Sequence, residues 1–432
     1  MKRTIEERLF AWKNKKDRMP LIVFGARQVG KTYTIFHFGK SNFKDVVVLT
    51  FEGNTVLQKI FDLNLDPVRI IHELESFSLK KIDRDTLVFF DEVQACKNAL
   101  TSLKYFYEQM PEQPIIAAGS LLGVALTRGE FSFPVGKVDR LTMYPLAFDE
   151  FLNALGEDAL LNVITDCFKA NTKMHENLHE RALLLYQEYL IVGGMPKVVD
   201  EYINKRDFDF VRVIQQNIIL GYLDDMSKYS TPAKANKTRA VYNSIPYQLA
   251  RENKKFIYQL VNSSARAVAY EEGILWLNDG GLIVRVNKAN EGKAPLYFYQ
   301  DALSYKIYMN DVGLLTAKSN IAPALITSTL GLGGEAKGAI TENYIVTALV
   351  ANGHSLYYWE SNGKAEVDFL VEIGGLPIPI EAKSADNVKA KSLGVFISKY
   401  EPPYSIRISS KNFGFENNIK SMPLYAAFCI KP

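Results

Sequence analysis

The first residues with the types and spacing to do chemistry lie in the stretch GARQVGKTYT, directly after the apolar run LIVF. Gly25, Gly30, Lys31 and Thr32 satisfy the pattern G-x-x-x-x-G-K-[ST] of a phosphate-binding loop. Glycines let backbone N–H groups face phosphates, and the helix that follows adds the positive end of its dipole. We expect Lys31 to reach the β- and γ-phosphates of ATP, and Thr32 to offer its hydroxyl to Mg²⁺. The predicted nucleotide-binding residues are Gly25, Ala26, Arg27, Gln28, Val29, Gly30, Lys31, Thr32 and Tyr33.

Two later strand-like runs supply the groups that hydrolysis needs. TLVFFDE ends in Asp91, which we expect to hold Mg²⁺ with Thr32, and Glu92, which we expect to polarise the attacking water. PIIAAGS ends in Ser120, either as a polar group between that water and the γ-phosphate or as the N-cap of a helix. With Lys31, these are the predicted catalytic residues. Both acids together favour hydrolysis over binding alone.

A positive charge for the γ-phosphate is harder to assign. Arg128, Lys137 and Arg140 are the nearby candidates, and each fits a surface charge equally well. The sequence favours none of them.

A second constellation lies near the C-terminus, in EVDFLVEIGGLPIPIEAK. On a strand, residues i and i+2 share a face, so Glu381 and Lys383 point together, and Asp368 can meet them across the Gly-Gly turn. Converging carboxylates bind Mg²⁺, and a lysine beside them can orient or deprotonate a water. Glu342, on a helix upstream, is a candidate third ligand. Phosphodiester cleavage and an inert binding platform both remain open.

The elements that position these residues follow from the apolar pattern. Residues 1–20 read as an amphipathic helix. Apolar runs at 21–24, 46–51, 86–90 and 114–119 show no alternation, which predicts parallel strands covered by helices on both faces. An α/β sandwich of about 150 residues would hold them.

The rest of the chain changes character twice. Residues 147–222 are helical in pattern, and the polar stretch 227–239 reads as a hinge or exposed connection. Two helical segments and a β-hairpin in 240–300 describe a winged helix. The last 110 residues return to α/β, with a helix near 338–351.

The charges of the predicted winged helix argue both for and against DNA binding. The second helix carries three acids, Glu271, Glu272 and Asp279, against one base, Arg266. Its surface is therefore expected to repel phosphate as much as it attracts it. Lys254, Lys255 and Arg266 are candidates for contact with a nucleic-acid backbone. The alternative is a packing joint between domains.

The amino-acid composition limits the partners and the cellular compartment that can be expected. Among 432 residues, 51 are Lys or Arg and 48 are Asp or Glu, a balance that argues against an extended nucleic-acid coat. Three cysteines, Cys96, Cys167 and Cys429, stand far apart, which is typical of a reducing compartment. The N-terminus lacks a signal-peptide core and no run of about 18 apolar residues occurs. A cytoplasmic protein is expected.

In order, the chain resembles bacterial and archaeal AAA-type P-loop ATPases fused to a C-terminal domain of unknown function, the 4143 family, with a PD-(D/E)xK nuclease-like core. The stretches that carry the likeness are FGARQVGKT, LVFFDEVQ, IIAAGSLLG, LTMYPLAFDEF, GGMPKVV, YEEGILWLNDGGLI, MNDVGLL, VDFLVE and IPIEAKS. The resemblance implies ATP and Mg²⁺ at the loop with Asp91 and Glu92. It also implies a nuclease-type arrangement of Glu342, Asp368, Glu381 and Lys383. Relatives often carry Gly-Arg where this chain has Gly136-Lys137, and lysine lacks the guanidinium fork of an arginine finger.

The expected fold is multidomain α/β: 1–150 a P-loop AAA-type ATPase domain, 151–226 a helical lid, 227–300 a winged helix and 301–432 the nuclease-like domain. The expected function is ATP hydrolysis coupled to the C-terminal domain in nucleic-acid processing or defence, with DNA or RNA as partner. The alternative is a nucleotide-dependent signalling or scaffold switch whose inert C-terminal domain binds a protein. A homo-oligomer is compatible with both.

Overall fold

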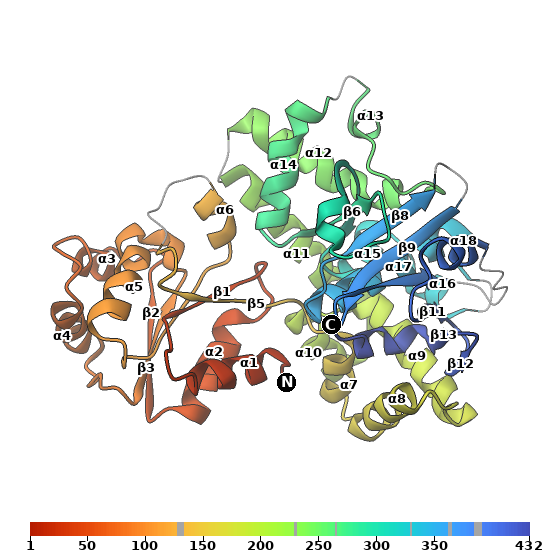
Figure 1. The fold of residues 1–432 in the computed structure, drawn as a ribbon. Helices are drawn as coiled ribbons and strands as arrows, with labels where there is room; N and C mark the ends of the chain where they lie inside the picture. The colour runs from red at the N-terminus through yellow and green to blue at the C-terminus, as the bar shows by residue number, and fades with distance from the viewer. Residues whose placement is uncertain (128–133, 229–230, 264–265, 329–330, 362–364, 384–390) are drawn as a thin grey trace. The chain divides into compact units, whose positions relative to one another are not determined.

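The chain divides into two compact units (Figure 1). The computed structural model describes residues 1–127, 134–228, 231–263, 266–328, 331–361, 365–383 and 391–432. The N-terminal unit comprises Lys2–Tyr144 with Asp279–Gly281, and the C-terminal unit comprises Met1, Pro145–Asn278 and Leu282–Pro432. No helix in the described ranges has the length and apolar character needed to cross a membrane.

The N-terminal unit alternates strands and helices. Its strands are β1 (Leu21–Phe24), β2 (Asp45–Thr50), β3 (Thr86–Asp91), β4 (Ile115–Ala118) and β5 (Asp139–Thr142). Its helices are α1 (Ile5–Lys13), α2 (Lys31–Asn42), α3 (Thr55–Ile60), α4 (Pro67–Ser78), α5 (Lys97–Gln109) and α6 (Leu122–Thr127), with a 3₁₀ turn η1 (Val93–Ala95). The four predicted strands are confirmed within one residue at each end.

These strands form one parallel sheet in the order β2-β3-β4-β1-β5. All six residues of β3 are buried, as expected of a central strand covered on both faces. Phe51, Phe61, Phe90 and Phe106 pack edge to face beside it. The prediction missed β5, because its residues alternate between half-buried and exposed and carry no apolar run. The parallel order places the carboxyl ends of β1, β3 and β4 at one edge.

The C-terminal unit begins with helices. They are α7 (Phe148–Ala154), α8 (Asp158–Ala170), α9 (Glu176–Val192), α10 (Pro196–Lys205), α11 (Phe208–Lys228), α12 (Pro232–Leu249), α13 (Tyr258–Val261) and α14 (Ala267–Asp279), whose last residue clusters with the N-terminal unit. The helical pattern of 147–222 is confirmed. The hinge predicted at 227–239 is wrong for 227–228, which end α11, and for 232–239, which are helical because Pro232 starts α12 and several good helix formers follow it. Residues 229–230 lie outside the described ranges.

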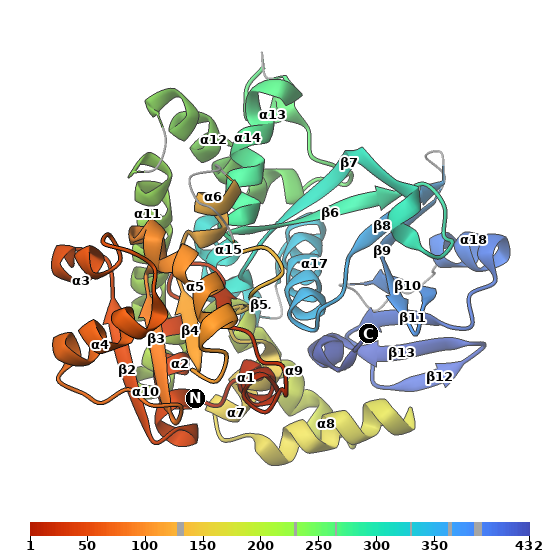
Figure 2. The ribbon, with the colours of Figure 1, turned by 60° about the vertical axis from the view of Figure 1, so that its left-hand side comes forward.

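The rest of this unit is built on an eight-stranded mixed sheet, ordered β12-β13-β11-β10-β9-β8-β6-β7 (Figure 2). Its strands are β6 (Ile283–Ala289), β7 (Gln300–Met309), β8 (Tyr357–Ser361), β9 (Ala365–Ile373), β10 (Leu376–Ala382), β11 (Ser405–Ser409), β12 (Gly414–Glu416) and β13 (Ile419–Pro423). The other elements are η2 (Leu296–Tyr299), α15 (Val312–Lys318), α16 (Pro323–Thr327), α17 (Gly334–Ala351), α18 (Lys391–Tyr400) and η3 (Leu424–Cys429). The hairpin expected in a winged helix is present as β6–β7, but β6 also pairs with β8. One sheet therefore continues across residue 300, where the predicted winged-helix domain was expected to end.

A buried carboxylate joins the helical part of this unit to its sheet. Asp311 accepts a hydrogen bond from Leu314 N (2.8 Å), which caps α15, and one from Gly194 N (2.6 Å) in the turn between α9 and α10. A Cβ on Gly193 would lie 2.3 Å from the same carboxylate. Burial raises the pKa of Asp311 to about 6, although these backbone donors oppose the shift. The stretches GGMPKVV and MNDVGLL thus meet at one joint.

We predict that Asp311→Ala destabilises the C-terminal unit by about 2–3 kcal/mol, because a helix cap is lost and Gly194 N is left buried without its acceptor. Asp311→Asn keeps one acceptor oxygen and should cost less. Urea unfolding followed by circular dichroism measures both.

A surface acid serves as the control for this prediction. Glu272 is 61% exposed at its side chain and pairs with Lys234. Glu272→Ala should change stability by less than about 0.5 kcal/mol. Equal effects of the two alanine substitutions would contradict the role given to Asp311.

Candidate functional site

The phosphate-binding loop connects β1 to α2, as the sequence predicts. Gly25 has a φ of 143° and Gly30 a φ of 93°, values that side chains rarely allow. A Cβ on Gly25 would also lie 2.3 Å from Met143 O. The Nζ of Lys31 folds back onto the loop and donates to Gly25 O and Ala26 O, both at 2.8 Å. Burial lowers the pKa of Lys31 to about 8, although Glu92 and Asp91 act in the opposite direction.

Thr32 and Asp91 meet across the sheet edge. The hydroxyl of Thr32 donates to both carboxylate oxygens of Asp91, at 3.0 and 3.2 Å. Burial, with a contribution from the neighbouring charge of Glu92, raises the pKa of Asp91 although Thr32 opposes the shift. A hydroxyl and a carboxylate beside a phosphate loop are the oxygen donors that Mg²⁺ takes together with a nucleotide, so these residues fit the ion.

Glu92 is held by donors on both of its oxygens. Ser120 Oγ donates to Oε1 at 2.7 Å, while Ser120 N (3.2 Å) and Gln94 Nε2 (2.5 Å) donate to Oε2. Burial favours the neutral acid, yet these hydrogen bonds outweigh it and lower the pKa of Glu92 below its usual value. The carboxylate is therefore ionised and aimed, as a general base must be.

The sequence reasoning missed two supports of this site. Gln94 lies beside Gly119, where a Cβ would stand 1.9 Å from Gln94 Oε1, so any larger residue at 119 would displace that amide. The buried guanidinium of Arg3 donates to Val29 O (3.0 Å) in the loop and to Tyr144 O (2.7 Å). Gln94 follows the acid pair by two residues, but its contact with Gly119 joins stretches that are distant in the sequence. Nothing near Arg3 in the sequence signals its contact.

The other predicted loop residues surround this arrangement. Arg27 and Gln28 are exposed, Ala26 and Val29 are buried, and the exposed ring of Tyr33 packs on His37 with centroids 4.2 Å apart.

The candidate positive charges have other neighbours or are not described. Lys137 pairs with Glu108 at 3.3 Å and lies over the Tyr107 ring. The guanidinium of Arg140 lies 6.0 Å from the centroid of Phe24. Arg128 falls outside the described residues.

In the C-terminal unit, a pocket of about 250 Å³ gathers part of the predicted second site. Glu342 on α17, Asp368 on β9 and Lys383 after β10 line it, and the sequence reasoning had not placed Lys254 there. The remaining lining residues are Gly338, Thr341 and Ala382. Ala382 N donates to Asp368 Oδ2 at 2.8 Å, which ties β10 to β9. Burial, with the negative charge of Glu342, raises the pKa of Asp368 to about 7.

Glu381 takes no part in lining this pocket. Its side chain is buried, Oε1 pairs with Lys383 Nζ at 2.9 Å, and Oε2 has no hydrogen-bond partner among the residues that the structure describes. Nor do the described residues contain any group of three His, Cys, Asp or Glu side chains arranged to hold a metal ion. Of the three predicted ligands, Glu342 and Asp368 thus share the pocket and Glu381 lies beside it. The i and i+2 positions do bring Glu381 and Lys383 together, but as an ion pair.

Three models of known protein families match parts of the chain. Residues 17–152 match the model of an AAA domain, and residues 337–427 match a domain of unknown function, DUF4143. Residues 183–325 match another domain of unknown function, DUF8612. No curated protein matches the chain.

Among solved structures, a Walker-type ATPase of Pyrococcus abyssi is 15% identical, with a TM-score of 0.46 over 74% of this chain and 95% of that one. The ORC2 protein of Aeropyrum pernix is 12% identical, with a TM-score of 0.34 over 74% and 92%. The RuvB branch migration motor of Thermotoga maritima is 13% identical, with a TM-score of 0.29 over 65% and 85%.

The family matches agree with the parallel sheet and its phosphate loop. The N-terminal part of the chain is thus similar to AAA domains, and its C-terminal part is similar to DUF4143 domains.

Proposed function

We propose that this protein hydrolyses ATP in its N-terminal unit with Mg²⁺ as cofactor. The observation that carries the proposal is the pairing of Thr32 with Asp91 beside a glutamate held by Ser120, all at one edge of a parallel sheet. Binding alone would need the loop and its lysine. An ionised, oriented Glu92 is the additional group that hydrolysis requires.

Each residue then has a distinct role. The loop N–H groups and Lys31 bind the phosphates, and Lys31 leaves its carbonyl partners to do so. Thr32 and Asp91 would hold Mg²⁺, which neutralises charge on the phosphates when bound. Glu92 accepts a proton from the attacking water, and Ser120 keeps the carboxylate aimed.

We predict that Glu92→Gln lowers kcat for ATP hydrolysis by about 10²–10⁴-fold while ATP still binds, because only the proton acceptor is lost. Lys31→Ala should abolish binding itself. Phosphate release and fluorescent-nucleotide titration measure the two effects separately. Lys44→Ala is the control, since the Lys44 side chain is 74% exposed and pairs with Asp83. Full activity of Glu92→Gln would exclude Glu92 as the base.

We further predict that Gln94→Met moves the acid limb of the kcat–pH profile to higher pH. Glu92 must be ionised to accept a proton, so kcat falls as pH drops below the pKa of Glu92. The Gln94 amide helps to lower that pKa, and its loss must raise it. Gln109→Met, an exposed substitution in the same unit, should leave the profile in place. A shift toward lower pH would contradict this assignment.

For the use of this hydrolysis we propose nucleic-acid processing or defence, with a protein-binding switch as the second candidate. The balanced charge of the chain gives the first no special support. The pairing of Glu342 with Lys254 favours the second, because it leaves the C-terminal pocket poorly suited to cleavage.

The two uses differ in what stimulates the ATPase. If nucleic acid is the partner, single- or double-stranded DNA or RNA should raise kcat several-fold, and salt should weaken the effect through counterion release. The rate is measured with and without each polymer, beside the Lys31→Ala variant. A real rate that no nucleic acid changes would favour the protein-binding switch.

A further inference from the structure

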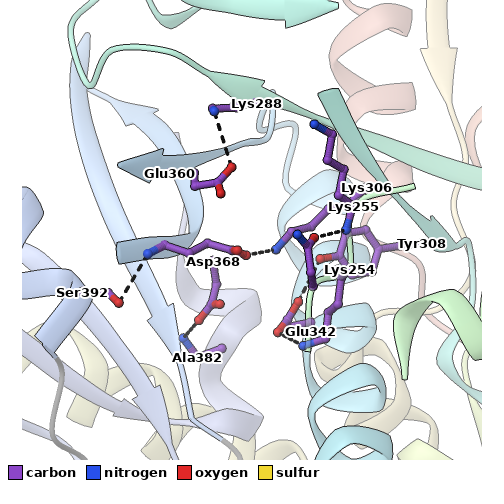
Figure 3. Close-up of polar contacts among 12 residues, drawn as sticks. Lys254, Lys255, Lys288, Lys306, Tyr308, Glu342, Glu360, Asp368, Ala382 and Ser392 are labelled. Atoms are coloured by element: carbon purple, nitrogen blue, oxygen red, sulfur yellow. Dashed lines mark hydrogen bonds and ion pairs between the residues drawn. The ribbon is translucent and has the colours of Figure 1, made fainter. Parts of the chain in front are cut away.

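The acids of the C-terminal pocket are already paired with lysines. Lys254, in the connection between α12 and α13, contacts Glu342 Oε1, and Tyr308 donates to Glu342 Oε2 at 2.9 Å (Figure 3). Both side chains of the Lys254–Glu342 pair are nearly buried, at 13% and 7% exposure. Both oxygens of Glu342 therefore have protein partners.

A second lysine, Lys306, is buried near the same acids. Lys306, in the middle of β7, is 1% exposed and contacts Glu366 Oε1. Burial alone would lower the pKa of Lys306, but the charges of Glu342, Glu366 and Asp368 raise it above its ordinary value. The side chain is thus a buried ammonium among three carboxylates.

A divalent cation and these ammonium groups compete for the same oxygens. Mg²⁺ needs carboxylate oxygens that are not already engaged. To reach Glu342 it would have to displace Lys254, and it would then stand close to the buried charge of Lys306 in a region of low dielectric. Lys306 is buried on β7, which pairs with β6, and its ammonium group already contacts Glu366.

We propose that Lys254 and Lys306 are the resident cations of this pocket, and that they exclude a divalent metal from the Glu342–Asp368 pair. The nuclease-type arrangement implied by the sequence resemblance is then a lysine-neutralised cluster. The key contact comes from Lys254, which lies in the sequence more than 80 residues before Glu342 and outside the strands that carry Asp368 and Glu381. The inference is independent of ATP hydrolysis.

Mn²⁺ binding to the full-length, nucleotide-free chain tests the proposal, with free Mn²⁺ followed by electron paramagnetic resonance. All chains carry Asp91→Asn, which removes the carboxylate proposed to hold the metal ion of the ATP site. With Lys254 present, we expect no saturable Mn²⁺ binding that depends on Asp368. Lys254→Met should raise the Mn²⁺ affinity at least about tenfold, because an ammonium in contact with Glu342 is lost. Adding Asp368→Asn should remove the gain.

Lys255→Met is the matched control. Lys255 lies in the same connection, but its charge acts on Asp301. It should produce no gain in Mn²⁺ affinity. If Lys254→Met fails to fold, Lys254→Gln keeps a donor for Glu342 and removes only the charge. Saturable, Asp368-dependent Mn²⁺ binding in the chain that keeps Lys254 would overturn the proposal, and so would a folded Lys254 variant without any gain.

Discussion

The nucleotide site depends on one constraint, the parallel order β3-β4-β1 in the N-terminal sheet. Carboxyl ends of parallel strands meet at one edge, so the loop after β1, Asp91 at the end of β3 and Ser120 after β4 become neighbours although the chain separates them widely. β4 stands between the other two strands. Ser120 is thereby placed to hold Glu92 while Thr32 reaches Asp91, and no residue of the site needs a long loop to position it.

This edge was predictable from the sequence because each of its parts is local. Each short, mostly apolar strand ends at its functional group or is followed by it within a few residues, and the parallel register aligns the strand ends. Gln94 was missed because its position depends on the missing side chain of Gly119, a contact between two strand ends that no single stretch records. The placement of β6 beside β8 was missed for a similar reason, since it joins segments about 70 residues apart.

For the C-terminal acids, spacing in the sequence predicts which side chains are neighbours but not which partners neutralise them. Alternation along a strand brought Glu381 and Lys383 together as predicted, but it could not decide whether they would share an ion or neutralise each other. The partners of the other acids were equally hidden, because Lys254 and Lys306, which contact Glu342 and Glu366, belong to other elements. Asp311 illustrates the same limit: its stretch could be recognised as a likeness, while its hydrogen bond to Gly194 spans more than 100 residues.

The carboxylates Asp91 and Glu342 differ in the groups that contact them, and this difference determines which ligands each can bind. Asp91 faces a hydroxyl, which can turn to share a cation with it, and the buried Lys31 bonds to carbonyls that it can exchange for phosphate. Glu342 faces an ammonium and a phenol, and Lys306 adds a further, buried charge. Removing two charges from water is costly, and a buried pair recovers that cost only while both partners stay in contact. The first site is therefore built to exchange ligands, whereas the second is stable only as long as its lysines remain.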